Sequence, residues 1–196
     1  MGLILGKITV ETPNYELLHK SPDYEIRKYP PCVAAQVTYD PAQLNNNRDG
    51  GFVILANYIG ALGEAQNSKP AEKIAMTAPV ITSESEKIAM TAPVMTSGGG
   101  TTTMRFLLPA KYRKAEEAPR PRDERVVIKE EGERKYGVAR FSGRAAEGEV
   151  KERAERLKTS LERDGFKVVG EFLLARYNPP WTLPPLRTNE IMVPVE

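Results

Sequence analysis

Histidine, cysteine and tryptophan each occur only once among the 196 residues. A single cysteine, Cys32, excludes an intramolecular disulfide and fits a reducing compartment. One histidine and one cysteine also cannot supply the nitrogen and sulfur ligands of a zinc site. No apolar run approaches the roughly 20 residues that a membrane-spanning helix needs. We therefore expect a soluble cytoplasmic protein with no membrane span.

Neither sign of charge dominates the chain. Lys and Arg number 28 and Asp and Glu number 26, which gives a net charge of +2. Such a balance creates no overall field that would attract nucleic acid or an anionic membrane. The basic cluster in residues 120–125 is interrupted by Asp123 and Glu124, which indicates a solvated loop. We expect no nucleic-acid partner.

Sequence signals of catalysis are also scarce. The chain contains neither a Gly-x-Ser-x-Gly motif nor a glycine-rich phosphate-binding loop. Glu130, Glu131 and Glu133 have the chemistry of general acids or bases, but a charged turn between strands is usually a solvated turn. We therefore predict no catalytic and no metal-binding residue.

The most distinctive feature that is present is a repeat. The phrase Glu-Lys-Ile-Ala-Met-Thr-Ala-Pro-Val fills residues 72–80, the first copy, and again residues 86–94, the second copy. Apolar side chains such as Ile74 and Met76 alternate along it, and a short polar linker separates the copies. This pattern predicts a hairpin of two strands. The proline in each copy favours a sheet edge or a bulge.

Strand patterns dominate the rest of the chain, with two helical patterns between them. Residues 24–29 and 32–39 are expected to form a hairpin around Pro30 and Pro31. We predict helices over residues 50–63, with Asp49 as N-cap, and around residues 150–161, ending at Gly165. Further strands are expected at 101–108, 125–129, 136–141, 166–177 and 190–195. Strands, a helix and strands thus occur twice, which indicates an α+β domain with two similar halves.

Four phrases connect this chain to a known family. They are Tyr24-Glu-Ile-Arg-Lys-Tyr29, the first copy of the repeat, Arg140-Phe-Ser-Gly143, and Tyr177-Asn-Pro-Pro180 followed by Arg187-Thr-Asn-Glu-Ile191. Through them the chain resembles a plant member of the SOUL / heme-binding protein family. The resemblance covers residues 12–196 and leaves 1–11 as an N-terminal segment. It implies a distorted antiparallel β-barrel of about eight or nine strands, flanked by two helices and built from two pseudo-symmetric halves. It also implies tetrapyrrole binding without enzymatic turnover.

The resemblance also implies a place for heme: an apolar groove between the first helix and the last inter-strand loop, as in relatives without a histidine ligand. A tetrapyrrole needs apolar walls and a few cations at one edge. Arg176 and Arg187 are candidate partners for the propionates, although either could instead form a structural salt bridge. The apolar wall candidates, which on the helix could equally be core residues, are Phe52, Leu55, Ala56, Ile59, Pro179, Pro180, Trp181, Leu183 and Leu186.

The sequence departs from the family pattern at the position of the proposed iron ligand and at the positions that would meet the heme propionates. Lys28 stands where some relatives carry a histidine proposed to bind iron, and a protonated lysine has no lone pair to donate. Asp49 and Asn57 stand near positions where relatives carry basic residues on the first helix. Ordinary structural roles are simpler explanations for the other candidate ligands, His19, Cys32, Met76 and Met90. The expected cofactor is therefore non-covalent heme without a histidine axial ligand.

Two functions from different classes remain open. The first is a monomeric carrier or buffer of heme or another porphyrin. The second is a gyrase-inhibitor-like domain, a remote relative of this two-half architecture, which would bind a small molecule other than heme and could hydrolyse it. Binding of hemin and of metal-free protoporphyrin distinguishes the two.

Overall fold

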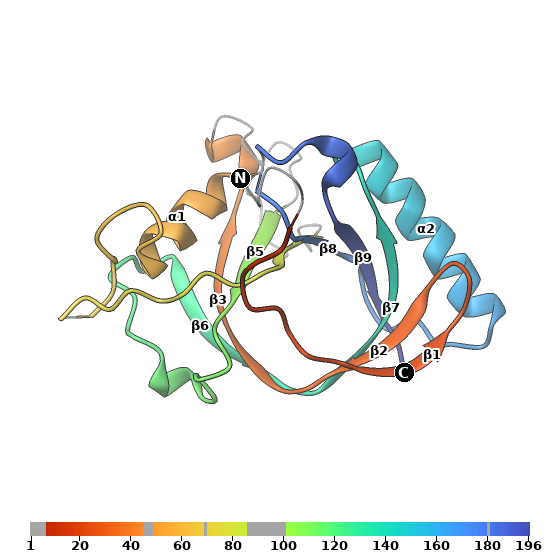
Figure 1. Cartoon of the computed structure of the whole chain (residues 1–196), viewed down its shortest axis with the longest axis horizontal. Helices are drawn as coiled ribbons and strands as arrows, with labels where there is room; N and C mark the ends of the chain where they lie inside the picture. The colour runs from red at the N-terminus through yellow and green to blue at the C-terminus, as the bar shows by residue number, and fades with distance from the viewer. Residues whose placement is uncertain (1–6, 45–48, 69, 86–100, 180) are drawn as a thin grey trace, which may run out of the picture.

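The structure is a computed structural model that describes residues 7–44, 49–68, 70–85, 101–179 and 181–196 (Figure 1). Its strands are β1 (Glu16–Lys20), β2 (Glu25–Tyr29), β3 (Cys32–Tyr39), β4 (Val80–Ser85), β5 (Thr101–Leu107), β6 (Val126–Glu131), β7 (Arg134–Phe141), β8 (Leu173–Arg176) and β9 (Asn189–Pro194). Its α-helices are α1 (Gly50–Ile59) and α2 (Glu147–Arg163). Short 3-10 helices cover Pro41–Leu44, Ala115–Glu117 and Pro184–Leu186. None of the helices in these ranges is long and apolar enough to cross a membrane.

All nine strands belong to one antiparallel sheet, in the order β1-β2-β7-β9-β8-β4-β5-β3-β6. Figure 1 shows the sheet curled into a half-barrel, with α1 and α2 on its outer face at opposite sides. Within the described part of the chain, β1 and β6 are the two edges, so the barrel is open between them. The predicted α+β fold with two flanking helices is confirmed.

The two halves have the same topology. The order β2-β7-β9-β8 in one half corresponds to β6-β3-β5-β4 in the other. Helix α1 lies between β3 and β4 in the chain, and α2 lies between β7 and β8. The halves are joined where β4 pairs with β8 through residues 80–82 and 174–176. Since each half presents a concave face to the other, the middle of the half-barrel encloses a space.

Helix α2 illustrates why the sequence forms a helix on each half. Its buried positions, Val150, Ala154, Leu157 and Leu161, follow a helical spacing and pack against β7 and β9. Its exposed face carries acid–base pairs four residues apart, such as Glu149–Arg153 at 2.7 Å. Helix α1 buries a similar stripe against β3 and β5. It ends at Gly60, whose φ of 78° suits glycine, rather than at the predicted Gly63.

Two of the predicted hairpins need correction. Strands β2 and β3 do not pair with each other, because β2 pairs with β1 and β7 while β3 pairs with β5 and β6. Pro30 and Pro31 instead carry the chain from one half of the molecule to the other. In the first copy of the repeat, residues 72–79 are irregular, and β4 begins only at Val80. The second copy lies outside the described residues.

Other predicted elements are confirmed with shifted bounds: β5 ends one residue before the expected 101–108 does, whereas β6 and β7 extend beyond the expected 125–129 and 136–141. The expected strand at 166–177 is regular only in β8, and residue 168 adds an isolated bridge to Val195. Asn67 helps to hold the irregular segment before β4 against α1. Its amide nitrogen donates to the Tyr58 and Glu72 carbonyls, and its amide oxygen accepts from the Glu72 backbone nitrogen. Hydrogen bonds to a buried side chain thus replace the sheet ladder that the alternating pattern predicts here.

We predict that Gly137→Ala in β7 destabilises the protein. A Cβ at Gly137 would lie 2.6 Å from two methyl carbons of Leu161, which is fully buried in α2. Overpacking of this kind costs about 1–3 kcal/mol of unfolding free energy. Urea unfolding measures the change. The control is Gly132→Ala in the β6–β7 turn, where no atom lies within 4 Å of the new Cβ. Equal stability of the two variants would contradict the close approach of α2 to β7.

Candidate functional site

The predicted helix face is part of the protein core. Leu55, Ala56 and Ile59 are buried in the cluster that joins α1 to β3 and β5. Phe52 is half-buried, and its ring centroid lies 5.4 Å from that of Phe106. In this conformation the three buried side chains have no free surface for a ligand. Their part in binding stays a prediction.

The predicted loop face, by contrast, is open to solvent. Trp181 is 63% exposed, Leu183 52% and Leu186 42%. Two hydrogen bonds hold the loop that carries them: within the loop, the Arg187 Nε donates to the carbonyl of the buried Thr182, and from the segment after β7, the Gly143 N–H donates to the Pro184 carbonyl. We call Trp181, Leu183 and Leu186 the loop surface. Apolar side chains gathered on an exposed, ordered loop are typical of a binding surface.

Arg176 connects β8 to the start of α1. Its Nη2 donates to the Asp49 carboxylate at 2.6 Å. Asp49 makes no side-chain cap bond to the helix, so its carboxylate serves this ion pair instead of the predicted N-cap role. Arg176 therefore has the structural salt bridge that the sequence analysis weighed, with an aspartate as partner. An exposed pair of this kind is weak, and a ligand carboxylate can compete for the guanidinium.

A hollow of about 260 Å³ lies beside this ion pair, between the start of α2 and strands β4 and β8. Its charged lining residues include the cations Arg144, Lys151 and Arg176. Phe172 and Leu174 supply an apolar side. Trp181, Leu183 and Leu186 do not line it, so the structure brings Arg176 to a hollow but does not bring the loop surface to the same one.

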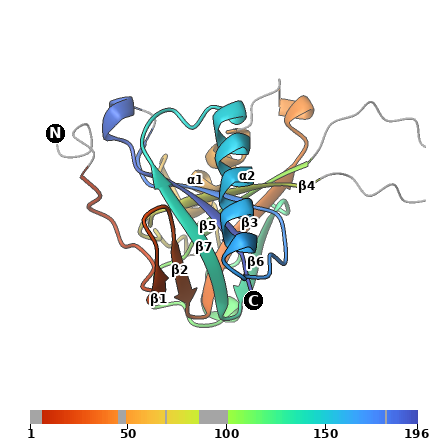
Figure 2. The same ribbon diagram turned by 90° about the vertical axis from the view of Figure 1, so that its right-hand side faces the viewer.

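The candidate iron ligands lie away from the loop surface. Lys28 pairs with Glu133 at 3.0 Å, and this hydrogen bond and charge hold the pKa of Lys28 above its usual range. The lysine is therefore protonated and unable to bind iron. His19 lies in the exposed strand β1, with its ring 5.9 Å from that of Phe166. Figure 2 shows β1 at the opposite end of the molecule from the Pro184–Leu186 helix.

The candidate sulfur ligands lie in other parts of the chain. Met76 is 36% exposed, in the irregular segment before β4. Met90 lies outside the described residues. Cys32 lines the interior of the half-barrel, where the Arg134 Nη2 donates to its sulfur at 3.3 Å. Among the described residues no group of three His, Cys, Asp or Glu side chains is placed to hold a metal ion.

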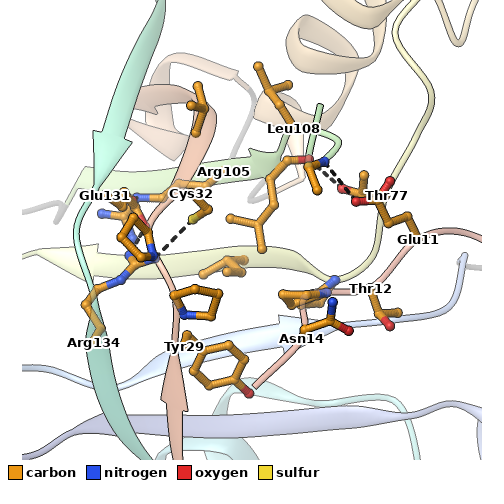
Figure 3. A pocket seen from close by; sticks show the side chains of 18 of the residues that line it. Glu11, Thr12, Asn14, Tyr29, Cys32, Thr77, Arg105, Leu108, Glu131 and Arg134 are labelled. Carbon is orange, nitrogen blue, oxygen red and sulfur yellow. Dashed lines mark hydrogen bonds and ion pairs between the residues drawn. The ribbon is translucent and has the colours of Figure 1, made fainter. Parts of the chain in front are cut away.

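The space between the two halves is a cavity of about 350 Å³, which the sequence analysis did not predict (Figure 3). Inner faces of strands from both halves form its walls, and residues 11–14 close one side. Thr77 and Pro79 of the first copy also line it. The Thr77 hydroxyl donates to the Leu107 carbonyl at 2.5 Å, which fixes the copy against β5. The first copy of the phrase is thus a cavity wall rather than a hairpin strand.

One end of the cavity carries a compact group of charges. Glu131 lies between two arginines: one oxygen is 3.4 Å from the Arg105 Nε, and the other contacts Arg134. The Nε of Arg134 is buried and has no hydrogen-bond partner in the part of the chain that the structure describes. Burial lowers the pKa of Arg105, and the neighbouring charge of Arg134 lowers it further. In Figure 3 this group lies on the side opposite Thr77 and Glu11.

Behind the cavity wall lies a buried ion pair. Arg27 in β2 is 6% exposed and Glu190 in β9 is 4% exposed, and they are joined at 3.0 Å. The Tyr177 hydroxyl donates to the second Glu190 oxygen at 2.7 Å. Burial, reinforced by the carboxylate, raises the pKa of Tyr177 far above its usual value. Burial also raises the pKa of Tyr29, whose hydroxyl accepts a bond from Arg27, to about 12.

The sequence did contain a signal for this arrangement. Arg27 and Tyr29 belong to the first family phrase, and Tyr177 and Glu190 belong to the last. In the structure these four side chains meet, although up to 163 positions separate them in the chain. As a family signature, however, the phrases do not indicate that their side chains meet in the folded chain.

Comparison with known proteins identifies one family and several solved structures of similar fold. The chain is similar in fold to the C-terminal domain of EcmrR, with a TM-score of 0.53 and 13% identity over 93% of this chain and 98% of that one. It is also similar to an uncharacterized conserved protein from Listeria innocua (TM-score 0.56, 12% identity, 90% and 94% covered). A hydrolase from Listeria innocua has a TM-score of 0.53, with 12% identity and 90% and 94% covered. At such identities the likeness concerns the fold alone.

No curated protein matches the sequence. The family model of the SOUL heme-binding protein, however, matches residues 10–194, which is nearly the whole chain. This match agrees with the nine-stranded half-barrel, its two repeated halves and its two outer helices. The chain belongs to the SOUL heme-binding protein family.

Proposed function

We propose that the protein binds heme or another porphyrin without a covalent bond and acts as a carrier or buffer of that ligand. In this proposal it is a monomeric, cytoplasmic member of the plant type, with no catalytic turnover and no nucleic-acid partner. The observation that carries this proposal is the family match over residues 10–194. Binding without turnover needs only an apolar surface for the macrocycle and cations for its carboxylates.

The loop surface supports tetrapyrrole binding at the predicted place. A porphyrin is a flat apolar plate, and Trp181 offers a flat, largely exposed aromatic face to it. Arg187 lies in the same loop, and Arg176 at its start pairs with the exposed carboxylate of Asp49. A guanidinium can bind a propionate through two parallel hydrogen bonds. Because Leu55, Ala56 and Ile59 are core residues here, this proposal places the macrocycle mainly on the loop.

The proposed heme lacks a histidine ligand. His19 is the one histidine of the chain and lies in β1, far from the loop surface. Lys28 remains protonated beside Glu133. Affinity then comes from apolar contact and from the propionates rather than from iron coordination.

A second proposal is a domain whose small-molecule ligand is not a heme. The half-barrel cavity of about 350 Å³, at the lower end of the usual range for ligand pockets, favours it. Hydrolysis would additionally require an activated nucleophile beside the bound molecule. The two proposals differ in whether porphyrins bind at all.

Titration with hemin and with metal-free protoporphyrin distinguishes the two proposals. We expect both to bind with affinities within about tenfold of each other, a difference of about 1.4 kcal/mol, because iron coordination contributes little. Absorbance in the Soret region measures both. In His19→Ala the hemin spectrum should not change. Much tighter binding of hemin, lost in His19→Ala, would show that the histidine is a ligand; no binding of either compound would favour the second proposal.

We predict that Trp181→Ala weakens porphyrin binding while the fold stays intact. An aromatic contact of this kind contributes about 1 kcal/mol or more, which corresponds to about fivefold or more in Kd. The fluorescence of the single Trp should also be quenched as porphyrin is added to the parent protein. Leu17→Ala is the control, because Leu17 is similarly exposed but lies in β1. Unchanged affinity in the Trp181 variant, without quenching in the parent, would place the porphyrin elsewhere.

A further inference from the structure

The middle of the half-barrel cavity is lined by apolar side chains. Leu107, Leu108, Ile81 and Met192 line it together with Tyr136. These side chains come from both halves of the sheet, so the cavity exists only because the halves face each other. An interior space of this size that is lined by apolar and aromatic side chains has the usual character of a small-molecule site.

The charged end of the cavity is not electrically balanced. Arg105 and Arg134 share the one carboxylate of Glu131, which leaves one positive charge in excess. The Glu131 side chain is 12% exposed and that of Arg105 is 22% exposed, so water screens the group only in part. Burial lowers the pKa of Arg105, and the nearby guanidinium of Arg134 lowers it further. A second carboxylate here would relieve the repulsion.

The Arg134 guanidinium is also incompletely bonded. Its Nη2 donates to the Cys32 sulfur, which is a weak acceptor, and its buried Nε has no partner among the described residues. A buried donor without a partner costs free energy that a bound acceptor would recover. Arginine presents its donors as a planar fork that matches a carboxylate.

We propose that the half-barrel cavity is a binding site for a small organic monocarboxylate with an apolar body. The carboxylate binds at Arg134 and Arg105, and the apolar body lies along Leu107, Leu108 and Ile81. Thr77 and Pro79 give the first copy of the repeat a role as the far wall of this site. The site is separate from the proposed tetrapyrrole surface and does not depend on it, because Trp181, Leu183 and Leu186 do not line the cavity.

Three eight-carbon probes with different head groups test the charge preference. Octanoate, octylamine and 1-octanol are titrated into the full chain by calorimetry. The rate at which iodoacetamide alkylates Cys32 then shows whether each probe occupies the cavity. Cys32 is the only cysteine of the chain and lines the cavity. Saturating octanoate should slow alkylation by about fivefold or more, while the amine and the alcohol at equal concentration should slow it by less than about twofold.

Variants at the charged end give effects of opposite sign. Arg134→Gln should weaken octanoate binding by about tenfold or more, because a charge-assisted pair is lost. Glu131→Gln should strengthen octanoate binding several-fold, because the competing carboxylate is removed. Arg125→Gln is the control, since Arg125 pairs with Asp123 in an exposed turn outside the cavity. If Arg134→Gln fails to fold, Glu131→Gln still tests whether removal of a negative charge strengthens octanoate binding.

Several outcomes would overturn this proposal. They are the absence of heat and of Cys32 protection with millimolar octanoate, equal protection by octylamine, and unchanged octanoate affinity in Glu131→Gln. Competition between hemin and octanoate, with protection of Cys32 by hemin, would assign the cavity to the tetrapyrrole and also overturn it. Failure of hemin to bind anywhere would contradict only the proposed function, because the octanoate measurements do not involve it.

Discussion

The buried Arg27–Glu190 ion pair is the constraint around which the half-barrel is arranged. Two charges that are at most 6% exposed are tolerable only when both are paired: Glu190 pairs with Arg27, which also pairs with Glu25 at 2.8 Å. Loss of one partner from a buried pair costs about 3–5 kcal/mol. The pair joins β2 to β9, and Tyr177 ties the end of β8 to the same carboxylate. Since β8 is the strand that pairs with β4 of the other half, this network fixes the strands that position both halves around the cavity.

The same architecture separates two surfaces of different character. Trp181, Leu183 and Leu186 are displayed on a loop that is ordered by bonds to its own backbone, and they suit a large flat molecule that remains partly in solvent. The cavity lies inside the half-barrel and carries an excess positive charge at one end, which suits a smaller ligand. A carrier benefits from an open surface, because exchange of its cargo does not require the core to open.

Sequence reasoning succeeded where local pattern decides structure and failed where distant segments meet. The spacing of Val150, Ala154, Leu157 and Leu161 was sufficient to predict α2. The repeated order of strands and helices was sufficient to predict two similar halves. The pairing of β2 with β7 could not be predicted from Pro30 and Pro31. Two prolines are compatible with a connection between the two halves as well as with a hairpin turn. Alternation in residues 72–79 predicted a strand, but bonds to Asn67 and to residue 11 hold that segment instead. Likewise, no local signal distinguishes a helix face in the core, as for Leu55, from one in a groove.

A crystal structure of the chain with protoporphyrin bound tests the central claim most directly. It would show where the macrocycle lies and which side chains meet its carboxylates. The account predicts a porphyrin stacked on Trp181, with its propionates toward Arg176 or Arg187 and with the half-barrel cavity free of porphyrin. A porphyrin inside the cavity, against Arg105 and Arg134, would contradict this account.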